Sequence, residues 1–70
     1  MGEYIPSLIM QFFAFDHLPE HLRKVSKPFG DLAVFVDHDL PNNAEKSTAL
    51  RKILEAKDAA VRAALFKQAA

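Results

Sequence analysis

The chain has 70 residues, of which nine are Lys or Arg, nine are Asp or Glu and none is Cys. A domain of this size buries only about 60% of its unfolded surface and normally needs an additional source of stability. Without cysteine, neither disulfides nor thiolate zinc sites supply it, nothing indicates an oxidising compartment, and self-association is the remaining route. The balanced charge argues against a nucleic-acid polymer as the ligand, but it is compatible with a small anion in a local basic pocket.

Residues 1–15 form an apolar N-terminal arm that contains the run YIPSLIMQFFAF. No basic segment precedes this run, and it is shorter than the roughly 20 residues that a membrane span requires. We therefore expect no targeting segment and no membrane partner. The segment before Met10 has no periodic pattern, which makes Met10 a candidate for the natural start. We expect the arm to pack on a neighbouring chain.

Apolar residues recur at steps of three and four over residues 18–40, which predicts an amphipathic helix. The residues of this face are Leu18, Leu22, Val25, Phe29, Leu32, Ala33, Val36 and Leu40. Pro28 removes one backbone donor and crowds the carbonyl of Lys24. We therefore expect a kink or a break near residues 26–28, where Ser26 is able to cap the second half of the helix.

The sequence PNNAE that follows Leu40 is typical of a helix start. Asn42 is able to cap this helix, and Glu45 lies near the positive end of its dipole. A corner at residues 40–43 then leads into a second helix over residues 43–67. The expected fold class is all-α: an antiparallel helical hairpin with a kinked first helix, assembled into a compact homo-oligomer.

The second helix carries two apolar stripes at helical spacing. The larger stripe, which suits the first helix, consists of Leu50, Ile53, Leu54, Val61, Ala64 and Leu65. The smaller stripe consists of Ala49, Ala56, Ala60 and Ala63. We expect this alanine stripe to form a subunit interface, with Val34, Phe35 and Phe66 as further apolar groups. In the alternative interpretation, Ala occurs there only because it is the best helix former.

The sequence gives no indication of a metal site, a cofactor or an enzyme. His17 and His21 are four residues apart, but no third ligand stands at a useful spacing. The DHD cluster at residues 37–39 has no accompanying nucleophile, and we interpret it as a solvated helix end. A glycine-rich phosphate loop is excluded, because the chain contains only two glycines.

Basic residues offer the clearest candidates for ligand binding. Lys27 stands beside Lys24 and Ser26 at the proline, where backbone amides are free to bind an anion. The alternative for Lys27 is a solvated side chain.

Three of the basic residues in the second helix also have possible partners. Lys57 falls within the large apolar stripe, where its charge must reach solvent, pair with an acid or face an anion. Reaching solvent is the commonest outcome. Arg62 can pair with Asp58, and Arg51 with Glu55, because each acid is four residues away on the same helix.

Three segments carry a resemblance to a known family: FFAFDHLPEHLRKVSKPFGDLA, then PNNAEKS, then ALRKILEAKDAAVRA. Over residues 10–65 the chain resembles the helical-hairpin family of bacteriophage cyclic-oligonucleotide sponges, the anti-CBASS proteins that share their hairpin domain with anti-Thoeris sponges. The resemblance implies a homohexamer in the cytoplasm of an infected bacterium. Such a protein binds cyclic di- and trinucleotides without degrading them and thereby blocks antiphage signalling.

The resemblance also implies roles for individual residues. Base stacking falls on Phe12 or, if the loop is gapped differently, on Phe15, where a Tyr would be familiar in the family. Arg62 lies near a basic position that serves the larger cyclic trinucleotides. The phosphate contacts fall on Lys27, with Ser26 and Lys24 as neighbours. The competing interpretation is a small protein-interaction module, such as a phage regulatory or assembly factor, with no nucleotide ligand.

Overall fold

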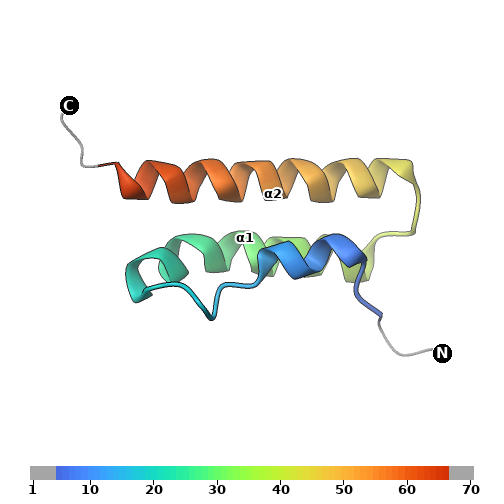
Figure 1. The fold of residues 1–70 in the computed structure, drawn as a ribbon. Helices are drawn as coiled ribbons and strands as arrows, with labels where there is room; N and C mark the ends of the chain where they lie inside the picture. Colours follow the sequence, from blue (N-terminus) through green and yellow to red (C-terminus); the bar gives the residue numbers. More distant parts are fainter. Residues whose placement is uncertain (1–4, 67–70) are drawn as a thin grey trace.

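The computed structural model describes residues 5–66 as one short 3-10 helix followed by two long α-helices (Figure 1). The 3-10 helix η1 spans Leu8–Phe13, α1 spans Glu20–Asp39 and α2 spans Ala44–Leu65. The two α-helices lie side by side and run in opposite directions. The predicted all-helical hairpin is therefore confirmed. Residues 1–4 of the arm and residue 67, the expected end of the second helix, lie outside the described residues.

The corner between the helices is set by a proline and a cap. Leu40 ends α1 in an extended conformation, because a residue that precedes a proline is disfavoured in the helical region. Asn43 begins α2, and its side chain accepts a hydrogen bond of 2.8 Å from the backbone N–H of Lys46. The expectation that Asn42 is the cap is wrong, since Asn43 is the residue directly before the first helical turn.

α1 continues through Pro28 without a break. The alternative of a broken helix is therefore wrong, and so is the expectation that Ser26 caps a second half. Ser26 is instead fully buried inside the helix, and its hydroxyl has no hydrogen-bond partner among residues 5–66. The buried residues Leu22 and Ala33, on either side of this region, hold the helix against its neighbours despite the missing donor.

The N-terminal arm folds back onto its own hairpin. Residues 7–13, which we call the strap, contain η1 and contact both α1 and α2. Phe13 of the strap is buried in one cluster with Ala33, Val36 and Leu50. Phe13 thus finds its apolar partners within the same chain, while packing of the arm on a neighbouring chain stays a prediction.

The core that results is small. Around the four buried residues lie partly buried apolar side chains, namely Ile9, Met10, Ala49, Ile53 and Leu54. Ala49 thus packs inside the chain and not on the outer alanine stripe, whereas Ala56 and Ala63 are exposed and Ala60 is partly exposed. Neither α1 nor α2 has the long apolar stretch that a bilayer crossing requires.

Candidate functional site

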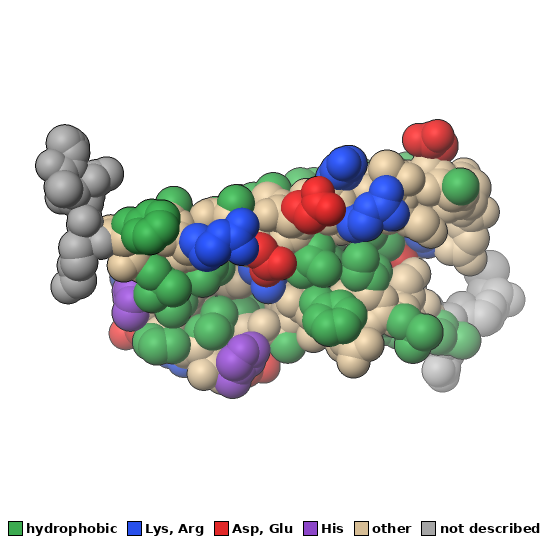
Figure 2. Space-filling view, turned by 45° about the horizontal axis from the view of Figure 1, so that its top comes forward, with side chains coloured by type: hydrophobic (Ala, Val, Ile, Leu, Met, Phe, Trp, Pro, Cys, Tyr) green, Lys and Arg blue, Asp and Glu red, His purple; other side chains and the backbone are tan. Residues whose placement is uncertain are grey.

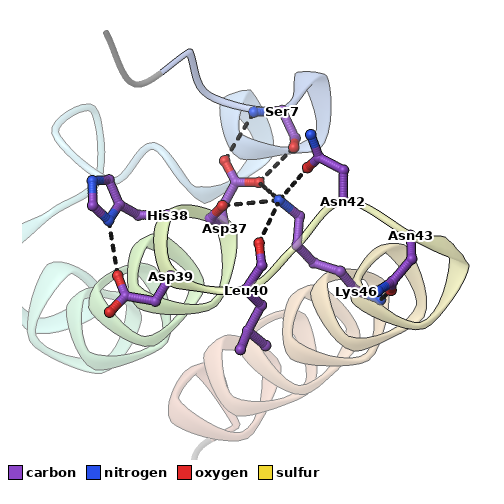
Figure 3. A network of polar contacts seen from close by, with 8 residues as sticks. All are labelled: Ser7, Asp37, His38, Asp39, Leu40, Asn42, Asn43 and Lys46. Carbon is purple, nitrogen blue, oxygen red and sulfur yellow. Dashed lines mark hydrogen bonds and ion pairs between the residues drawn. The ribbon is translucent and has the colours of Figure 1, made fainter. Parts of the chain in front are cut away.

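A buried ion pair joins three segments at the corner end of the hairpin (Figure 3). The Nζ atom of Lys46 lies 3.3 Å from Oδ1 of Asp37, and the two side chains are only 7% and 1% exposed. Lys46 also donates to the backbone carbonyl of Asp37 at 2.9 Å, to that of Leu40 at 3.5 Å and to the side-chain oxygen of Asn42. Asp37 in turn accepts hydrogen bonds from the backbone N–H of Ser7, at 2.9 Å, and from its hydroxyl.

This cluster, which we call the corner clamp, overturns one prediction. Asp37 was interpreted as part of a solvated helix end, but it is buried because the strap covers the last turn of α1. A buried charge is costly unless it is paired and hydrogen-bonded, and both conditions hold here. His38 and Asp39 do remain largely exposed, with 2.8 Å between His38 Nδ1 and Asp39 Oδ1. The corner clamp is a structural element of the fold, because its two buried charges pair with each other and with hydrogen-bonding groups of the same chain.

A hollow of about 410 Å³ lies at the other end of the strap. The strap and the following loop form one wall, and the fourth and later turns of α2 form the opposite wall. Figure 2 shows that charged side chains gather along the upper helix of this face, with hydrophobic side chains beneath them. The residues that line the hollow are Gln11, Phe12, Ala14, His17, Leu18, Lys57, Asp58, Val61 and Arg62.

Lys57 lines this hollow from the α2 wall. Its side chain is only 12% exposed, and its Nζ atom lies 3.1 Å from Oδ1 of Asp58. The same ammonium donates a hydrogen bond of 2.9 Å to the backbone carbonyl of Phe12. Of the three outcomes that the sequence allows, pairing with an acid is therefore the one observed, and the strap carbonyl is a partner that the sequence did not indicate.

The two aromatic candidates differ in how accessible they are. Phe12 lines the hollow and is 58% exposed, so its ring can accept a stacked base. Phe15 is only partly exposed, and its ring lies next to Gly30 of α1, where an added Cβ would be 3.9 Å from two ring carbons. The geometry within one chain therefore favours Phe12 over Phe15 for stacking.

Arg62 shares the hollow with Phe12 and is exposed. The expected pair between Arg62 and Asp58 does not form, because Asp58 pairs with the neighbouring Lys57. The expected pair between Arg51 and Glu55 is likewise absent; Glu55 lies 3.9 Å from Lys52. Within residues 5–66 Arg62 has no ion pair, and its guanidinium is available to a ligand.

The remaining candidates stand apart from the hollow. Lys24 and Lys27 are exposed on α1, and neither they nor Ser26 line it. Lys27 donates to Asp31 at 2.8 Å, and Lys24 lies 3.9 Å from Glu20. A phosphate that binds Lys27 has to displace an exposed pair, which is worth only about 0.2–1 kcal/mol. One chain therefore brings Phe12 and Arg62 together but does not place Lys24 or Lys27 beside them.

Other kinds of site find no support in the described part of the chain. No group of three His, Cys, Asp or Glu residues in it is arranged to hold a metal ion. His17 lines the hollow, whereas His21 does not. Comparison of the chain with protein-family models, with curated proteins and with solved structures finds no match. Function is therefore inferred from the residues of the hollow and from the resemblance described above.

Proposed function

We propose that this protein binds and sequesters cyclic di- and trinucleotides without degrading them and so blocks antiphage signalling in the cytoplasm of an infected bacterium. The observation that carries the proposal is the exposed ring of Phe12 at the edge of a hollow that also holds the unpaired Arg62. A cyclic trinucleotide presents flat bases and phosphates, which match an aromatic face beside this cation, whereas a cyclic dinucleotide is proposed to combine the same ring with Lys27 of another copy. The resemblance to the cyclic-oligonucleotide sponges supports the same ligand class.

The expected energies suffice for such a ligand. Stacking of a base on an aromatic side chain contributes about 1–3 kcal/mol, and a hydrogen bond to a charged group contributes about 1.5–3 kcal/mol. Two stacked bases and two such hydrogen bonds together reach the range of micromolar or tighter binding, which corresponds to about 8 kcal/mol. A protein without net charge can therefore bind a dianion through local contacts.

The proposed pocket is shared between copies of the chain. Lys27, with Lys24 and Ser26 near it, would come from α1 of one copy, and the ring of Phe12 from another. Exposed apolar side chains support assembly; the large ones are Ile5, Leu8, Phe12, Leu32, Val34, Phe35, Leu40, Leu65 and Phe66. A compact homohexamer, closed in part through Ala56, Ala60 and Ala63, is the proposed assembly.

Calorimetry with a panel of cyclic di- and trinucleotides tests this function. Phe12→Ala and Lys27→Ala should each weaken dinucleotide binding at least tenfold, or about 1.4 kcal/mol. Asp31→Asn should strengthen it, because the substitution releases Lys27 and removes a negative charge. Arg62→Ala should spare dinucleotides and weaken trinucleotides. Lys52→Ala, which removes an exposed lysine that does not line the hollow, is the matched control.

The second candidate function is a protein-interaction module. The observation that favours it is the exposed apolar surface of α1, which includes Leu32, Val34 and Phe35. Failure of every cyclic oligonucleotide to bind would refute sequestration and leave this candidate. Ligand that is converted to a product on prolonged incubation would instead indicate an enzyme.

A further inference from the structure

The strap is anchored at both ends by side chains of opposite charge. At its first residue, the backbone N–H and hydroxyl of Ser7 donate to the carboxylate of Asp37 on α1. In its last turn, the carbonyl of Phe12 accepts from the ammonium of Lys57 on α2. Each helix of the hairpin thus supplies one anchor, and the two anchors face opposite ends of the same short element.

These anchors supply hydrogen-bond partners that a short 3-10 helix lacks at its two ends. A run of six residues is marginal by itself, and its first N–H groups and last carbonyls lack partners within the helix. Asp37 accepts from the N–H that precedes η1, and Lys57 donates to a carbonyl of its last turn. An anion at the N-terminal end and a cation at the C-terminal end also match the direction of the helix dipole.

The ammonium of Lys57 is occupied by contacts within the chain. It is held between the Phe12 carbonyl and the Asp58 carboxylate, and little of its side chain reaches solvent. Arg62, in the same hollow, is exposed and has no ion pair within residues 5–66. The two cations of the hollow are therefore in different states, one fixed to the backbone of the strap and one open to a ligand.

We propose that Lys57 is a positioning residue that holds Phe12 in place for ligand stacking and does not itself bind the ligand. This inference rests on the proposed function, since it names what fixes the stacking ring. Because the hydrogen bond is made by the backbone of Phe12, losing it frees the residue that carries the ring without altering the ring. The anchor at Ser7 lies at the far end of the strap and cannot replace it.

Hydrogen exchange in the ligand-free protein tests the positioning directly. Lys57→Met keeps the apolar stem and removes the ammonium, and it should speed exchange of the Phe13 and Ala14 amides at least tenfold. Exchange at Leu50, in the core of α2, should stay unchanged. Lys57→Arg should restore protection, and Lys52→Met, on the exposed side of α2, is the matched control. Unchanged exchange at Phe13 and Ala14 would overturn the inference.

A double-mutant cycle on cyclic-dinucleotide binding tests the link to the ligand. Lys57→Met should weaken binding about tenfold in the wild-type background and cause no further loss in the Phe12→Ala background. Additive losses would mean that Lys57 contacts the ligand itself, which would overturn the positioning role. If Lys57→Met fails to fold, Lys57→Gln, which shortens the reach to the strap carbonyl, takes its place in both experiments. If the wild type binds no cyclic nucleotide, the proposed function fails, while the exchange measurement still decides whether Lys57 fixes Phe12.

Discussion

Lys46 is a buried lysine whose ammonium is surrounded by oxygen atoms. Its ammonium has oxygen atoms from Asp37, Leu40 and Asn42 around it and is shielded from solvent. Removing one partner of a buried pair leaves the other charge without compensation, which typically costs about 3–5 kcal/mol. In a domain of this size that is a large part of the total stability, which is usually about 5–15 kcal/mol.

Lys46→Met should therefore lower the free energy of unfolding by about 3–5 kcal/mol, as measured by urea denaturation followed by circular dichroism. Lys52→Met, at an exposed position, should change it by less than about 0.5 kcal/mol. The double variant Asp37→Leu/Lys46→Met should lose less than the sum of its single variants, because no unpaired charge remains. A loss below about 1 kcal/mol for Lys46→Met would contradict the structural role of the corner clamp.

The sequence could not predict the corner clamp. Asp37 and Lys46 stand on different helices, and only the path of the corner brings them together. The burial of Asp37 also depends on Ser7, thirty positions away in a segment without periodicity. A family resemblance made Phe12 and Arg62 candidates for ligand binding. The hydrogen bond of Lys57 could not be predicted in this way, because its acceptor is a backbone carbonyl, which every residue has.

Among the elements, α1 is the one that departs most from ideal helix chemistry. Pro28 is exposed within it and cannot donate a backbone hydrogen bond. The helix forms nonetheless, because burial of its apolar residues against α2 and the strap outweighs the lost donor.

Pro28→Ala should stabilise the protein by about 2 kcal/mol, since an interior proline is about 3 kcal/mol less favourable than Ala in a helix and part of this is offset by a more flexible unfolded chain. The rise should appear as a higher urea midpoint. Pro41→Ala, at the corner where a proline suits the end of α1, is the control and should give no gain. A lower midpoint for Pro28→Ala would show that the ring of Pro28 makes a stabilising contact.

The elements themselves were largely predictable. The three- and four-residue spacing of apolar side chains located both helices to within a few residues, and the corner lies at residues 40–43 as expected. The expected cap, Asn42, was one residue too early, because two adjacent Asn residues suit that position equally well. Asn43 caps α2, whereas the side chain of Asn42 accepts a hydrogen bond from Lys46. The strap lacks periodicity, and its return onto the hairpin was therefore missed.

The whole molecule is long and thin, with extents of 50 × 23 × 15 Å. A body only 15 Å across cannot enclose many side chains, which explains why the buried apolar residues number so few. Large apolar side chains such as Phe35 and Leu65 consequently stay exposed in the single chain. This is the surface that self-association would cover.

Ala60→Glu should dissociate or unfold the assembly, because it places a charge in the proposed close-packed interface. Light scattering after size exclusion should give an oligomer for the wild type and a smaller species for the variant. Ala44→Glu, at an exposed position in the first turn of α2, is the control and should leave the mass unchanged. A stable wild-type monomer at micromolar concentration would contradict self-association.

The placement of the strap anchors also fixes the order in which a growing chain can finish folding. Lys57 is 45 positions beyond the carbonyl that it binds, so the ribosome makes the strap long before its second anchor exists. At about 5–20 residues per second, that interval lasts roughly 2–9 seconds. Helix formation takes only about a microsecond, so the synthesis of Lys57, and not the formation of α2, sets this delay. The strap is thus secured only after most of the hairpin has been made, although it precedes both long helices in the chain.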